Sequence, residues 1–166
     1  MPTAFARLYA DLAPAVAGYL RVQRAAEPED LTNEVFLGVF RGLASFQGTE
    51  TQFRSWVFTI AHRRLQDERR RLARQPHFTA VDAEISMPGG DVEQEALDSL
   101  GEQWVMAMSQ HLSADQRTVL LLRTVADLTA EQVAQITGKR VGAVRALQRR
   151  ALETLRRNLA RKGVQI

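Results

Sequence analysis

The sequence contains no cysteine, which excludes disulfides, thiolate metal sites and thiol nucleophiles. It also lacks an apolar run near the roughly 20 residues that a membrane-spanning helix needs. The N-terminus does not combine a basic start with an unbroken apolar stretch, so no signal peptide is predicted. With 45% hydrophobic and 25% charged residues among 166, the composition is that of one or two small globular domains. We expect a cytoplasmic protein without membrane insertion.

Residue patterns typical of catalytic sites are missing as well. His62, His77 and His111 are far apart, and none has a metal-ligand spacing such as His-Glu-x-x-His. The sequence contains neither a glycine-rich phosphate loop nor a nucleophile elbow. We therefore predict no enzyme activity, no cofactor and no metal site.

Charge is distributed unevenly although the formal net charge is only +3. Residues 54–74 carry seven arginines against two acids, and residues 139–162 carry nine basic residues against one acid. Between them, residues 75–116 carry eight acids and no lysine or arginine. Two basic blocks separated by an acidic stretch favour two surfaces that bind polyanions.

Apolar residues recur at helical spacing along most of the chain, and no long stretch alternates apolar and polar residues. Proline and glycine cluster where the charge changes sign, which predicts a linker. The predicted fold is all-α, with two small helical domains joined by a flexible acidic linker. The predicted segments are residues 1–74 for the first domain, 75–91 for the linker and 92–166 for the second domain.

The first domain is predicted to contain a helix from Ala4 to about Val22 and a second one that begins near Glu29-Asp30. The second helix has one broad apolar face, made of Leu31, Val35, Phe36, Val39, Phe40 and Leu43. A polar loop over residues 47–52 precedes a third helix that begins at Phe53. In that helix we expect Trp56 and Ile60 to be core residues, whereas Phe46, before the loop, is the better candidate for stacking on an unpaired base.

The second domain is predicted to open with a helix from Val92 to Gln110. Its inward-facing residues, together with the one that follows the helix, would be Leu97, Leu100, Trp104, Met108 and Leu112. Ser113 with Gln116 three residues on forms a capping box, which marks the start of the next helix.

A helix-turn-helix follows. Thr129 and Gln132 form a second capping box, and Gly138 lies where the chain must turn, since glycine reaches left-handed backbone angles without steric cost. Val144 would plug the angle between the two helices. In such a motif the second helix enters the major groove of DNA. Its polar face here would consist of Lys139, Arg140, Arg145, Gln148, Arg149 and Arg150.

With these motifs the sequence resembles the extracytoplasmic-function (ECF) sigma factors, the smallest class of bacterial RNA polymerase sigma subunits. Residues 29–37 (EDLTNEVFL) resemble the family's polymerase-binding helix. Residues 53–61 (FRSWVFTIA) resemble its promoter-melting helix, and residues 112–123 with 128–155 resemble its C-terminal helix-turn-helix.

The resemblance implies a transcription initiation factor whose partners are core RNA polymerase and promoter DNA, with an anti-sigma factor as a further candidate. The helix-turn-helix residues named above would then contact the −35 element. The residues expected to contact the −10 element are Phe46, Gln47, Arg54, His62, Arg63 and Arg70. The residues expected to contact polymerase are Asp30, Asn33, Glu34 and Leu37. The sequence has His62 close to a position where the family often has asparagine, and its −35 helix departs from the usual one at residues 143, 146 and 147, so promoter preference is not implied.

Two other classes of protein fit part of the sequence. A one-component regulator would explain the helix-turn-helix but not the arginine-aromatic segment or the polymerase-binding helix. A helical adaptor that binds only acidic proteins would explain the basic blocks, and would not bind DNA.

Overall fold

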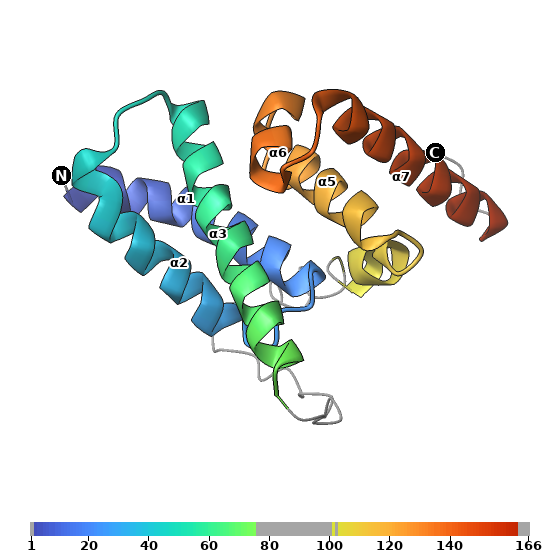
Figure 1. Ribbon diagram of the computed structural model, residues 1–166, viewed down its shortest axis with the longest axis horizontal. Helices are drawn as coiled ribbons and strands as arrows, with labels where there is room; N and C mark the ends of the chain where they lie inside the picture. Colours follow the sequence, from blue (N-terminus) through green and yellow to red (C-terminus); the bar gives the residue numbers. More distant parts are fainter. Residues whose placement is uncertain (1, 76–100, 102, 163–166) are drawn as a thin grey trace.

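The protein is described here by a computed structural model, which covers residues 2–75, 101 and 103–162 (Figure 1). Every regular element among the described residues is helical, as predicted. None of the described helices is long and apolar enough to cross a membrane. The predicted linker, apart from residue 75, and the predicted start of the second domain lie outside the described residues.

Three long helices form what we call the N-terminal bundle. They are α1 (Pro2–Val22), α2 (Pro28–Gly42) and α3 (Glu50–Ala73), with the short 3-10 helix η1 (Leu43–Ser45) between the last two. Pro28 occupies the first turn of α2, where a missing backbone N–H costs nothing. The buried side chains that join the three helices include Val16, Tyr19, Leu20, Val35, Val39, Val57, Phe58 and Leu65.

The remaining helices form the C-terminal bundle, which consists of helical residues 103–109, α5 (Ala114–Thr124), α6 (Ala130–Thr137) and α7 (Val141–Arg161). Both predicted capping boxes are present: Ser113 caps α5 and Thr129 caps α6, each accepting a hydrogen bond from the backbone N–H of the glutamine three residues on. Figure 1 shows α6 beside α3, with α5 and α7 on the side of α6 that is farther from α3. Most buried apolar residues of the two bundles belong to one continuous cluster, whereas Met108, Leu112, Ala151 and Leu159 lie outside it.

The structure corrects two expectations about the first domain. The helix α3 begins at Glu50 rather than Phe53, because Thr49 and Gln52 form a third capping box within the segment expected to be a loop. Phe40 was expected on the apolar face of α2, yet its side chain is 63% exposed. Trp56 and Ile60 pack against the core, as predicted, and remain partly exposed.

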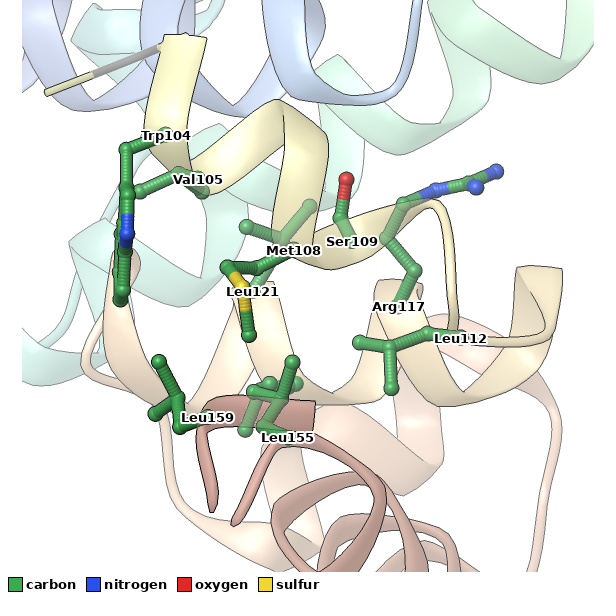
Figure 2. Close-up of a pocket in the computed structure, with 10 residues that line it drawn as sticks. Trp104, Val105, Met108, Ser109, Leu112, Arg117, Leu121, Leu155 and Leu159 are labelled. Carbon is green, nitrogen blue, oxygen red and sulfur yellow. The ribbon is translucent and has the colours of Figure 1, made fainter. Parts of the chain in front are cut away.

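A further correction concerns Trp104, which was expected to face inward but is 55% exposed. Met108 and Leu112, from the same predicted set, are buried as expected, and Leu97 and Leu100 lie outside the described residues. Together with Leu155 and Leu159 of α7, Trp104 lines an apolar groove with a volume of about 160 Å³ (Figure 2). The indole therefore forms part of a groove wall instead of closing the core.

Candidate nucleic-acid interface

The junction between α6 and α7 has the geometry of a helix-turn-helix. Gly138 ends α6 in the left-handed conformation, with φ at 72°, where an L side chain is strained. The backbone N–H of Lys139 then donates to the carbonyl of Ala134 at 3.2 Å, which closes the turn. Val144 is fully buried in the angle between the helices, as predicted from its spacing.

With Val144 turned inward, α7 presents arginines to solvent. Arg145 and Arg149 are exposed and lie four residues apart, so they share one face of the helix. Arg140, which precedes the first turn of α7, and Arg150 are also exposed. All four guanidinium groups are therefore accessible, and Arg145 with Arg149 forms a single arginine face on α7.

Two of the predicted cations are held by carboxylates of the same bundle. Arg145 NH2 lies 3.1 Å from Glu131 Oε1, and Lys139 Nζ lies 3.2 Å from Asp115 Oδ2. Exposed ion pairs contribute only about 0–1 kcal/mol. A phosphate or a base edge can therefore replace the carboxylate at low cost, while the pairs orient both side chains beforehand.

Gln148 differs from the rest of the predicted set. Its Oε1 accepts a hydrogen bond from Arg123 Nε at 3.0 Å, and Arg123 also donates to the carbonyl of Leu128. The amide oxygen is thus directed toward α5 and the loop that follows it, away from the exposed arginines.

In the N-terminal bundle, an aromatic stack supports the loop before α3. The Phe46 ring stacks on Trp56 with centroids 5.1 Å apart and meets the edge of Phe53 at 5.2 Å. Trp56 lies so close to the backbone of Gly42 that a Cβ atom there would be 2.7 Å from the indole. Gln47, the next residue of the loop, is exposed. One face of Phe46 is therefore occupied, and an unpaired base can extend the stack only from the other face.

The arginines predicted to contact the −10 element do not share one surface. Successive residues of a helix are rotated by about 100°, which places Arg63 and Arg70 on one face of α3 and Arg54 on nearly the opposite one. Arg63 and Arg70 are exposed, whereas Arg54 is partly buried. Arg71 and Arg74, which were not among the predicted residues, line a shallow hollow together with Arg70, and the run of arginines in the sequence was a signal that could have included them.

His62 lies apart from both groups. The hydrogen bonds of its ring join Nδ1 to the Tyr19 hydroxyl at 2.9 Å and Nε2 to Gln66 Nε2 at 3.3 Å. Burial lowers the pKa of His62 below its usual value of 6.5, and the nearby Arg69 lowers it further. Burial also raises the pKa of Tyr19, to about 12. In this arrangement His62 is partly buried, and its environment disfavours the protonated form.

The predicted polymerase-binding residues form a continuous exposed face on α2. Asp30, Asn33, Glu34 and Leu37 are all exposed at positions i, i+3, i+4 and i+7, which is one side of a helix. Leu37 is 54% exposed, and Phe40 extends the same face by another turn. Phe40 was not predicted as a polymerase-binding residue, because its spacing fits the apolar face of α2 almost as well as the exposed face.

Comparison with known families identifies both bundles. The sequence model described as Sigma-70 region 2 matches residues 8–75, and the one described as Sigma-70, region 4 matches residues 102–155. The ECF RNA polymerase sigma factor ShbA of Streptomyces griseus is 36% identical over 132 residues, which cover 77% of this chain and 69% of ShbA. The ECF RNA polymerase sigma factor BldN of Streptomyces coelicolor is 30% identical over 168 residues, which cover 94% of this chain and 60% of BldN.

Solved structures share the fold at lower identity. The sigma factor RpoE of Bartonella quintana, solved with the anti-sigma factor NepR, superposes with a TM-score of 0.69 at 21% identity and covers 95% of this chain and 97% of that one. CnrH, solved with the cytosolic domain of CnrY, gives a TM-score of 0.66 at 20% identity and covers 96% of this chain and 90% of that one.

Proposed function

Because the chain belongs to the ECF sigma factors of the sigma-70 family and so directs promoter-specific transcription initiation through regions 2 and 4, we propose how its own residues divide that work. The C-terminal bundle reads the −35 element as duplex DNA. The N-terminal bundle melts the −10 element and captures an unpaired base. The exposed face of α2 binds core RNA polymerase.

The arginine face of α7 is the observation that carries this proposal. Arg145 and Arg149 project from the first three turns of the second helix of a helix-turn-helix, the part that contacts base edges in the major groove. Arginine pairs with the two acceptors of guanine and also binds phosphate. Lys139, Arg140 and Arg150 border these two residues and would bind the DNA backbone. Gln148 would take part only after releasing Arg123.

The aromatic stack before α3 supports base capture at the −10 element. An unpaired base would stack on the free side of Phe46, and Gln47 would supply hydrogen bonds beside it. Stacking of a base on an aromatic side chain contributes about 1–3 kcal/mol. Arg63 and Arg70, on the exposed face of α3, would hold the phosphates of the same strand.

The exposed face of α2 supports the polymerase contact. Leu37 and Phe40 provide apolar area, and the acidic Asp30 and Glu34 select a basic partner surface. The similar proteins RpoE and CnrH were solved with NepR and CnrY, so an anti-sigma factor is a candidate regulator of this chain as well.

Reconstituted transcription tests the proposal. Core polymerase would be assayed with and without this protein on a promoter library that is randomised at both elements. We expect initiation only when both proteins are present, with one preferred sequence at each element. Sequence-specific promoter binding by the free protein at physiological salt, without core polymerase, would contradict the division of labour described here.

A further inference from the structure

An ion pair joins the two helices of the helix-turn-helix. Glu131 lies in the first turn of α6, and Arg145 lies in the second turn of α7. A guanidinium N–H of Arg145 donates to Glu131 Oε1 at 3.1 Å, across 14 residues of the sequence. The Arg145 side chain is 64% exposed and the Glu131 side chain is 62% exposed. A carboxylate therefore lies at the surface beside the arginine face of α7.

The second arginine of this face differs in its surroundings. Arg149 is exposed four residues beyond Arg145, and among the described residues no carboxylate lies within ion-pair distance of it. The same helix face thus carries one arginine whose charge is balanced by a carboxylate and one whose charge is not. This difference isolates what Glu131 adds, because the two side chains are otherwise identical.

The carboxylate leaves most of the Arg145 guanidinium available for DNA. The planar guanidinium of an arginine has five N–H donors, and the hydrogen bond to Glu131 uses one of them. A guanine needs two donors, one for O6 and one for N7. Arg145 can therefore bind a guanine while Glu131 still holds it. A guanidinium that is already held also loses less freedom when it binds.

The same carboxylate acts differently on a base and on a phosphate. The acceptors of guanine belong to a neutral base, whereas a phosphate is an anion. A phosphate bound to Arg145 would lie close to Glu131, and the two negative charges would repel each other. At a separation of about 6 Å and a dielectric constant of about 40–80, this repulsion weakens binding about 3- to 10-fold. Binding of guanine does not meet this repulsion.

We propose that Glu131 is a positioning residue that sets the specificity of the −35 contact, because it holds Arg145 for guanine and disfavours the binding of phosphate by the same guanidinium. This inference rests on the proposed function, in which Arg145 reads the −35 element. Glu131 acts through Arg145 and need not contact DNA itself. It lowers the affinity for DNA in general and raises the ratio between the right and the wrong sequence, as an unfavourable contact with the wrong partner does.

Variants of the full chain, assembled with core polymerase, test the inference. Glu131→Gln removes the charge and keeps an oxygen that can accept a hydrogen bond from Arg145. Asp127→Asn is the matched control, because it removes one charge from an exposed residue of the loop before α6. Asp127 has φ at 55°, a conformation that asparagine also adopts. Both variants are made with Arg145 present and in an Arg145→Ala background. Transcription from a library of −35 variants measures base preference, and binding to a promoter with a scrambled −35 element is measured against salt.

We expect Glu131→Gln to reduce the preference for guanine about 3- to 10-fold at the position read by Arg145, because the freed guanidinium can bind a phosphate when the base is wrong. The salt dependence of binding to the scrambled promoter should steepen by up to about one counterion. The preference at the position read by Arg149 should not change. Asp127→Asn should have neither effect, and Glu131→Gln should have none in the Arg145→Ala background.

The outcomes separate this inference from the proposed function. If Arg145→Ala relaxes base preference and Glu131→Gln does not, the role of Glu131 is overturned and the proposed function stands. A Glu131→Gln effect that is equal at every −35 position, or that persists without Arg145, would also overturn it, since a loss of helix stability would act in that way. If Arg145→Ala changes no preference, both the inference and the proposed −35 contact fail.

Discussion

The predicted DNA-binding residues of the two bundles differ in how they are arranged. In the C-terminal bundle, the arginines of α7 are exposed and are oriented by a carboxylate of the same bundle, as in the pair of Arg145 and Glu131. In the N-terminal bundle, the predicted groups are divided among the aromatic loop before α3, the exposed face of α3, and His62, which is bonded to Tyr19 of α1 and Gln66 of α3. The predicted C-terminal residues thus lie on α7 and the two residues before it, whereas the predicted N-terminal residues do not share one surface.

The largest effect is expected when the buried side chain that supports the C-terminal helix-turn-helix is replaced. Val144 is fully buried between α6 and α7, and Val144→Asp would place an unpaired charge there. We expect a loss of more than about 3 kcal/mol in the free energy of unfolding, measured by chemical denaturation, and loss of −35-dependent transcription. Ala160→Asp is the exposed control in the same helix and should cost less than about 1 kcal/mol. Equal stability of the two variants would show that Val144 does not support the motif.

The next prediction distinguishes the residues of α7 that contact bases from those that contact phosphates. Arg145→Ala and Arg149→Ala should each cost about 1–3 kcal/mol at one position of the −35 element and relax the preference there. Arg157, further along the helix and bonded to Thr154, should contact phosphate, so Arg157→Ala should weaken binding evenly and reduce the salt dependence by about one counterion. Transcription from a library of −35 variants measures both. If Arg145→Ala weakened binding evenly and Arg157→Ala changed base preference, α7 would present a different face to DNA.

A smaller effect tests the polymerase face of the N-terminal bundle. Glu34 is exposed on α2, so Glu34→Lys should change the stability of the protein by less than about 0.5 kcal/mol. Affinity for core polymerase should fall about tenfold, because the acidic side chain would meet a basic surface. A titration of labelled protein with core polymerase measures this loss, and Glu153→Lys on α7 is the control. If the Glu34 variant bound core polymerase with unchanged affinity, this face of α2 would not be part of the polymerase interface.

The smallest expected effect concerns pH. The folded protein lowers the pKa of His62 below 6.5 through burial and Arg69, and the other groups that bond its ring are the Tyr19 hydroxyl and the Gln66 amide. Below about pH 6.5 the unfolded chain therefore binds a proton that the folded protein resists, so stability falls as the pH falls through this range. His62→Gln should reduce the loss of thermal stability between pH 7.5 and 5.5. His111→Gln, at an exposed site, should not.

The sequence predicted the parts of the structure that local interactions determine. The capping boxes at Ser113 and Thr129, the left-handed Gly138 and the inward Val144 each depend on a few neighbouring residues, and all four are confirmed. The same box at Thr49 was mistaken for part of a loop, although Thr-x-x-Gln is the pattern that identified α6. This error was avoidable, because the signal was present in the sequence.

Other features could not be predicted, because they depend on contacts between distant segments. Spacing places Phe40 and Trp104 near the apolar faces of their helices, but burial depends on how distant segments pack, and both side chains are more than half exposed. His62 fits a surface role by its motif, yet its hydrogen bond to Tyr19 crosses 43 residues. Which residues of the predicted sites contact DNA and polymerase remains a prediction.

The central claim is that each bundle reads its own promoter element. It is tested most directly by transcription from a library randomised at both elements, with wild type, Phe46→Ala, Arg145→Ala and the double variant. We predict that Phe46→Ala changes base preference only at the −10 element, that Arg145→Ala changes it only at the −35 element, and that the double variant combines both changes. A change at the opposite element in either single variant, or a uniform loss of output without any change in preference, would contradict the claim.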